Sequence, residues 1–160
     1  MDPKLAAFLS LIAWSEGTST SPLTGDQNGY NVIVTGINGP SVFTDYSHHP
    51  FELGGSVCVR EGLYSTAAGR YQLLARYWRV YKVQLNLPDY SPASQDAVAL
   101  QQIKERGALL NIEAGNIELA ISLCANIWAS FPGNSYSQGG KTMPQLLAEY
   151  QTLLGSNTSS

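Results

Sequence analysis

Apolar residues recur at helical spacing over most of this sequence, and proline and glycine mark where the helical segments begin and end. Asp2-Pro3 and Ser91-Pro92 each combine a capping residue with proline, which is favoured in the first turn because it has no N–H to leave unpaired. Thr142-x-x-Gln145 has the pattern of a capping box. A chain with these helix start and stop signals is expected to be mostly helical.

Six helical segments are predicted in this way. They cover residues 3–16, 67–87, 91–107, 108–114, 117–131 and 142–155. Gly17 is predicted to end the first segment and Gly155 the last, because glycine readily takes the left-handed conformation that follows a helix. Asn116 is predicted to cap the fifth. Residues 156–160 are predicted to form a disordered tail.

The β content is predicted to be small. Residues 30–35 and 42–45 alternate as strands do, and Asn38-Gly39-Pro40 between them indicates an antiparallel hairpin. Residues 54–65 are rich in glycine and predict either a third edge strand or a mobile flap. We therefore expect an α+β fold, mostly helical with one small antiparallel sheet. No repeat or long linker divides the chain, which predicts a single domain over residues 1–155.

Charge and composition exclude some classes of function. The chain has 9 basic and 12 acidic residues, a net charge of −3, and no Lys/Arg cluster for nucleic-acid phosphates. The apolar run at residues 5–14 is too short to span a bilayer, and no signal peptide is visible, so we expect no stable membrane association. Cys58 and Cys124 permit one disulfide, which the sequence alone does not decide; so few cysteines fit a reducing cytoplasm.

Glu16 is the strongest candidate catalytic residue. It closes the first predicted helix beside Trp14, with no Lys or Arg next to it. A helix C-terminus carries partial negative charge, and apolar neighbours desolvate a carboxylate, so both effects raise the pKa of Glu16. A general acid working near neutral pH needs such a shift. The alternative is an exposed glutamate without a role.

A second carboxylate would change the chemistry that is available. Asp26 lies in the polar loop at residues 18–29, and Asp45 ends the second strand. Either residue would make a hydrolase possible if it held a water opposite Glu16. The structural alternative is a turn residue for Asp26 and a local hydrogen bond at the hairpin end for Asp45.

Other reactive residues fit a site less well. His48 and His49 are adjacent and point in different directions on a strand, and no ligand set with metal spacing accompanies them, so no metal is expected. Ser15 has no histidine nearby in sequence for a serine triad. A cysteine amidase would require Cys58 to pair with one of the two histidines. We expect no cofactor.

Several stretches of the sequence resemble the bacteriophage lambda endolysin family, in order and over residues 5 to 150. The resemblance is carried by residues 13–18 (AWSEGT), 43–47 (FTDYS), 68–74 (AGRYQLL), 94–102 (SQDAVALQQ), 103–108 (IKERGA) and 126–130 (NIWAS). The sequence departs from the family in residues 18–28, in residues 54–64 and beyond Pro132. These are loops that we expect to flank the substrate.

The resemblance implies a lysozyme-like fold whose sheet borders the substrate cleft. It also implies a lytic transglycosylase that cleaves the bond between N-acetylmuramic acid and N-acetylglucosamine without water, with Glu16 as the catalytic glutamate. Tyr71 and Gln72 fall on the family's cleft motif. Asp45 is a further candidate for substrate binding, as are Tyr136 and Gln138 in a glycine-rich loop with little apolar content.

A transglycosylase of this kind implies a partner and a compartment. Its substrate is the glycan strand of peptidoglycan. We expect a monomer that accumulates in the host cytoplasm, depends on a holin-type membrane protein for release, and acts in the periplasm. The first alternative is a hydrolysing lysozyme that uses Asp26 or Asp45. The second is a non-catalytic wall-binding module, which the absence of internal repeats disfavours.

Overall fold

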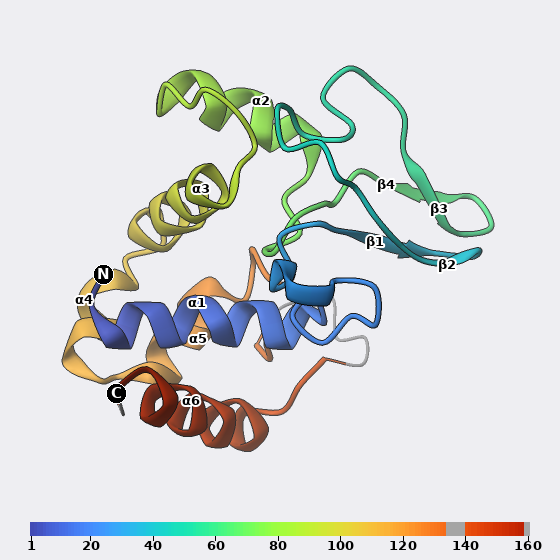
Figure 1. Ribbon diagram of the computed structural model, residues 1–160. Coiled ribbons are helices and arrows are strands. Elements are labelled where there is room, and N and C mark those ends of the chain that lie inside the picture. The colour runs from blue at the N-terminus through green and yellow to red at the C-terminus, as the bar shows by residue number, and fades with distance from the viewer. Residues whose placement is uncertain (134–139, 159–160) are drawn as a thin grey trace. The chain divides into compact units, whose positions relative to one another are not determined.

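The computed structural model describes residues 1–133 and 140–158. The chain divides into two compact units. One contains Met1–Glu16 and Ala99–Ser160 and is called here the helical unit; the other, Gly17–Val98, is called the hairpin unit. The described residues of the helical unit form helices, whereas those of the hairpin unit form helices and two antiparallel hairpins, which confirms the α+β class (Figure 1).

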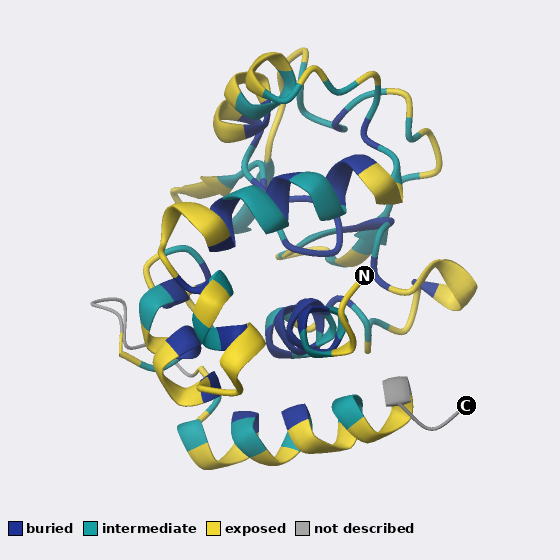
Figure 2. Cartoon of the chain, turned by 90° about the vertical axis from the view of Figure 1, so that its left-hand side faces the viewer, coloured by how far each residue is buried: buried dark blue, intermediate teal, exposed yellow. Residues whose placement is uncertain are grey.

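The helical unit is built around its first helix. It contains α1 (Pro3–Glu16), the end of α3 (Pro92–Glu105), α4 (Leu109–Ala114), α5 (Ile117–Cys124) and α6 (Met143–Thr158). α1 packs against α4 and α6 and is buried on nearly every side, as expected of a helix with few polar residues. Figure 2 shows α6 with buried residues along one face and exposed residues on the other. The helix that ends at Glu16 is therefore held by the core of this unit.

The predicted caps are confirmed by hydrogen bonds. The Lys4 N–H donates to Asp2 Oδ1 at 2.8 Å, and the two members of the capping box bond reciprocally, Thr142 N–H to Gln145 Oε1 at 2.9 Å and Gln145 N–H to Thr142 Oγ1 at 3.3 Å. Asn116 lies at the N-cap position of α5, as predicted, but its side chain makes no capping hydrogen bond. α6 continues to Thr158 instead of ending at Gly155.

The hairpin unit contains two two-stranded antiparallel sheets where one sheet was predicted. β1 (Val32–Gly36) pairs with β2 (Gly39–Val42), and β3 (Val57–Arg60) pairs with β4 (Leu63–Ser65). The two hairpins lie side by side (Figure 1). A Cβ at Gly36 would come within 2.5 Å of Val57 Cγ1, so only glycine allows this approach.

The first hairpin turns earlier than predicted. Gly39 and Pro40 belong to β2, and the turn is formed by residues 37–38. Proline is tolerated there because β2 has a free edge in a two-stranded sheet, where a missing N–H costs no ladder bond. Residues 43–45, which were predicted as strand, follow β2 without regular structure.

The predicted helix over residues 67–87 is wrong in its first part. α2 spans Ala75–Gln84, and α3 follows it. Residues 66–74 form a tight turn in which Gly69 and Gln72 have φ angles of 89° and 53°, which no right-handed helix contains. Ala68 forms isolated bridges with Ile33 and Leu73. Tyr71 and Gln72 therefore lie on a turn beside β1.

His49 is fully buried in the hairpin unit and has both ring nitrogens occupied. The Phe51 N–H donates to Nδ1 at 3.0 Å, which leaves the proton on Nε2 to be donated to the Leu73 carbonyl at 2.8 Å. Neither nitrogen is free for a metal. Burial lowers the pKa of His49 below its ordinary value of 6.5. The neutral ring is therefore part of the folded structure.

This burial predicts a loss of stability in acid. Below pH 6.5 the unfolded chain takes up a proton at His49 while the folded protein does not, so the free energy of unfolding falls until the lowered pKa is passed. His49→Gln should flatten this dependence in urea unfolding and cost about 1–3 kcal/mol at pH 7 through its lost bonds. The control is His48→Gln, whose side chain is 43% exposed. Equal slopes for His49→Gln and wild type would contradict the assignment.

Candidate active site

Glu16 lies at the last residue of α1, where its carboxylate meets the turn that follows α5. Ser130 Oγ donates a hydrogen bond to Glu16 Oε2, and Ser15 Oγ donates in turn to Ser130 Oγ at 2.7 Å. The last turn of α1 contains no basic residue. The site is thus one carboxylate held by a hydroxyl from a distant part of the chain.

The protonation of Glu16 follows from its surroundings. Burial, the largest influence, raises the pKa of the Glu16 carboxyl above its usual 4.5, although the residue keeps some exposure to solvent. The hydrogen bonds from the hydroxyl and backbone of Ser130 act in the opposite direction, because they favour the charged form. The pKa of Glu16 is therefore raised, as expected from the sequence, and desolvation is the main cause.

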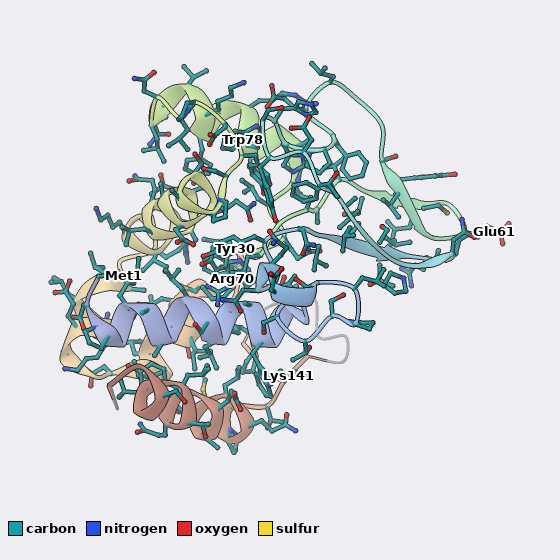
Figure 3. The ribbon with its side chains drawn as sticks, viewed as in Figure 1. Met1, Tyr30, Glu61, Arg70, Trp78 and Lys141 are labelled. Carbon is teal, nitrogen blue, oxygen red and sulfur yellow. The ribbon has the colours of Figure 1, made fainter. Side chains whose placement is uncertain are left out.

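A buried polar network supports the turn at residues 66–74 in the hairpin unit. Arg70, 6% exposed, donates from Nε to the Asn28 carbonyl at 3.0 Å and from Nη1 to the Tyr71 hydroxyl at 2.9 Å. Tyr71 and Tyr30 both donate to Asp96 Oδ1, at 2.6 and 2.8 Å. The Arg70 guanidinium lies 5.2 Å from the centre of the Tyr30 ring. Both residues are labelled in Figure 3. The network links the loop at residues 18–30, this turn and α3.

Gln72 is fixed by the same turn. Its Nε2 donates to the carbonyls of Val32 at 3.2 Å and Gly69 at 3.0 Å, so its amide is oriented before any ligand arrives. Tyr71, by contrast, is 4% exposed and uses its hydroxyl inside the network. Of the two predicted binding residues on this turn, Gln72 is the more accessible to a ligand.

The two candidate second carboxylates lie on the surface of the hairpin unit. Asp26, in the short 3₁₀ helix η1 (Gly25–Gln27), accepts a bond from Gln27 Nε2 at 3.0 Å. Asp45 accepts the Ser47 N–H at 2.9 Å and lies 3.6 Å from His48 Nε2. The bonds from Ser47 lower the pKa of the Asp45 carboxyl. Both residues therefore have the local structural roles that a turn residue would have.

The structure also answers the remaining questions about cysteines, metal ligands and membrane-spanning helices. Cys58 and Cys124 are free thiols. Within residues 1–133 and 140–158 no group of three or more His, Cys, Asp or Glu side chains could hold a metal, and no helix is long and apolar enough to cross a membrane. Tyr136 and Gln138 lie outside the described residues.

Ser130 and Asp96 were not among the site residues predicted from the sequence. Ser130 is 114 residues from Glu16, and Asp96 is 25 residues from Tyr71, so no local spacing connects them. Both are polar residues within segments that also carry the family resemblance, which is the one signal that could have drawn attention to them.

Comparison with known proteins matches this chain to one family along nearly its whole length. A family model described as Endolysin covers residues 6–157. The endolysin of Escherichia phage P2 is 53% identical over 154 residues, with 94% of this chain and 93% of the relative covered. The endolysin of Escherichia phage lambda is 52% identical, with coverages of 91% and 87%.

Solved structures agree with the sequence relatives. Bacteriophage lambda lysozyme complexed with a chitohexasaccharide matches with a TM-score of 0.87 and 49% identity, over 96% of this chain and 95% of that one. A second structure of lysozyme from bacteriophage lambda matches with a TM-score of 0.78 and 45% identity, over 98% and 93%.

Proposed function

The chain belongs to the endolysin family, which degrades bacterial peptidoglycan for host lysis, and from this we propose that it acts as a lytic transglycosylase with Glu16 as its acid and base. The observation that carries the proposal is the setting of Glu16. Burial raises the pKa of its carboxyl, whereas the pKa values of Asp45, Glu52 and Asp89 are shifted downward. Among these carboxyl groups, Glu16 is thus the one whose setting favours the protonated form.

One carboxyl group is enough for this reaction. Glu16 donates its proton to the glycosidic oxygen as the bond from that oxygen to C1 of the muramic acid breaks. The 6-hydroxyl of the same muramic acid attacks C1, and the Glu16 carboxylate accepts the hydroxyl proton. A 1,6-anhydro ring forms, no water is consumed, and Glu16 is protonated again. The internal nucleophile avoids the entropic cost of binding a water.

The proposed substrate contacts among the described residues come from the hairpin unit. We assign to Gln72 a hydrogen bond accepted by its Oε1 from the N–H of an N-acetyl group, because both protons of its Nε2 are donated to the Val32 and Gly69 carbonyls. Tyr71 supports this residue from within the buried network. Asp45, Tyr136 and Gln138 are further proposed contacts. The chitohexasaccharide bound to lambda lysozyme supports a glycan strand as the ligand. The single family model over residues 6–157 supports one catalytic domain over residues 1–155.

We further propose where the protein is made, how it leaves the cytoplasm and where it acts. We assign synthesis as a monomer to the host cytoplasm, passage through the inner membrane to a holin-type protein, and cleavage to the periplasm. No cofactor takes part.

Product analysis tests the reaction type. Peptidoglycan is digested in ¹⁸O-labelled water and the released muropeptides are measured by mass spectrometry. They should carry 1,6-anhydromuramic acid ends, which are one water lighter than reducing ends and contain no label. The reason is that the nucleophile is the substrate's own hydroxyl. Labelled reducing ends on muramic acid would instead identify a hydrolase, and no release of muropeptides would identify a binding module.

The hydrolysing lysozyme is retained as a second candidate for one reason. The lowered pKa of the Asp45 carboxyl keeps it ionised near neutral pH, which a general base requires. If labelled reducing ends are found, Asp45→Asn and Asp26→Asn should be compared, and the residue that positions the water should be the one whose loss stops hydrolysis.

A further inference from the structure

A directional chain of hydrogen bonds ends on the Glu16 carboxylate. Ser15 Oγ donates to Ser130 Oγ, so the lone pair of Ser130 that faces Ser15 is used as an acceptor, and the Ser130 hydroxyl proton is directed to Glu16 Oε2. Ser15 is 7% exposed, which keeps water from replacing it as the donor. Both hydrogen bonds are therefore donated in the direction of the Glu16 carboxylate.

This polarity distinguishes the two oxygens of Glu16. An oxygen that accepts the Ser130 proton is not the oxygen that carries the acidic proton of the neutral carboxyl. Building on the function proposed above, we propose that Ser130 is a positioning residue, supported by Ser15, which confines the catalytic proton to Glu16 Oε1 and fixes the plane of the carboxyl group.

The turn that carries Ser130 is anchored firmly enough for this role. Trp128 and Phe131 on either side of it are each 1% exposed, and the Phe131 ring packs edge-on against Phe8 of α1, with centroids 6.1 Å apart. The Lys141 N–H donates to the Ser130 carbonyl at 2.9 Å. A Cβ at Gly140 would lie 2.6 Å from that carbonyl oxygen, so the glycine permits the contact. Ser130 is thus tied to α1 through the core.

The charged side chains around α1 do not take over the effect that Ser130 has on Glu16. On elements packed against α1 they are Glu113 of α4, Glu149 of α6 and Lys141 before α6; α1 itself carries Asp2 and Lys4 at its opposite end. Lys141 Nζ lies 4.9 Å from the centre of the Trp14 ring. The influences on the pKa of Glu16 are burial and the two hydrogen bonds from Ser130.

The arrangement suits a group that acts as acid and then as base. The Ser130 bond strengthens when Glu16 becomes charged, so it stabilises the carboxylate left after the first proton transfer. Oε1 keeps the same place for giving the proton away and for taking one back. A rotating carboxyl group would lose this alignment between the two steps.

Ser130→Ala tests the proposal in two independent ways. A ¹³C titration of the Glu16 carboxyl, assigned by its absence in Glu16→Gln, should show its midpoint about one pH unit higher than in wild type, because a hydrogen bond to the charged form is lost. In wall digestion, kcat should fall about tenfold to a hundredfold with KM nearly unchanged, and the alkaline limb of the pH profile should move to higher pH by a similar amount. Ser130→Thr, which keeps the hydroxyl, should restore most of both.

The possible outcomes separate the role of Ser130 from the reaction. A lower rate with neither the titration nor the alkaline limb displaced would mean a structural role and would overturn the proposal. If the titration of Glu16 is displaced in Ser130→Ala but the wild type releases no muropeptides, the role of Ser130 is supported and the proposed function is rejected. If Ser130→Ala does not fold, Ser15→Ala decides: a smaller displacement in the same direction supports the chain, and an unchanged titration overturns it.

Discussion

Replacing Glu16 with glutamine is expected to lower the rate of wall lysis by about a thousandfold, within the range found for removing a general acid or base. The amide cannot donate the proton that the glycosidic oxygen needs, and it cannot accept one from the attacking hydroxyl. The measurement is the turbidity of a peptidoglycan suspension, with muropeptide release as a second readout. Glu113→Gln is the matched control, because Glu113 is exposed on α4 of the same unit. Lysis by Glu16→Gln near the wild-type rate would remove Glu16 from the mechanism.

The same variant should be at least as stable as wild type at neutral pH. Burial raises the folded pKa of Glu16 above 4.5, so between pH 4.5 and that raised value the folded protein keeps a proton that the unfolded chain has lost. The free energy of unfolding therefore falls as pH rises through this window. Glutamine does not titrate and avoids the loss. The difference between variant and wild type should be greatest above the window and should shrink as the pH falls toward 4.5.

Arg70→Ala is expected to destabilise the protein by about 3–5 kcal/mol, as measured by urea unfolding. Arg70 is 6% exposed, and alanine would leave the Asn28 carbonyl without this donor and Tyr71 without the guanidinium beside it. The Thr18 hydroxyl donates to the backbone carbonyl of residue 70 at 2.6 Å, and this bond remains available in the alanine variant. A loss of this size is a large fraction of the stability of an ordinary domain.

Arg76→Ala is the comparison for this variant. Arg76 is exposed on α2, with its guanidinium 4.8 Å from the centre of the Tyr77 ring, and should change stability by less than about 0.5 kcal/mol. If both arginine variants unfold at the same urea concentration, the buried network does not stabilise the hairpin unit. If only Arg70→Ala is destabilised, lysis should also fall, because Gln72 lies on the turn that Arg70 supports.

The parts of the fold that follow from neighbouring residues could be predicted from the sequence. Asp2 and the pair Thr142 and Gln145 cap their helices with hydrogen bonds to residues at most three positions away, and Gly17 takes the left-handed conformation after α1 with a φ of 81°. Such signals are local, so a single sequence contains them in full.

The parts that depend on distant partners could not be predicted. The apolar spacing of residues 67–87 is helical throughout, yet Gly69 and Gln72 adopt positive φ. A Cβ at Gly69 would come within 2.5 Å of Gln95 Oε1, a contact with a residue 26 positions later that the local pattern does not contain. Likewise, the raised pKa of Glu16 was expected, but the hydroxyl that opposes it comes from Ser130, more than a hundred positions later. Contacts at such separations leave no periodic pattern in the sequence.

The packing of α1 against α6 has a consequence for the timing of activity. α1, which carries Glu16, precedes α6 in the chain and leaves the ribosome before α6 is made. Until α6 emerges, the side of α1 that packs against α6 has no partner, and the helical unit that holds Glu16 is incomplete. Under the proposed mechanism, a chain cut short before α6 is therefore expected to release no muropeptides, because the helix that carries Glu16 lacks one of its packing partners.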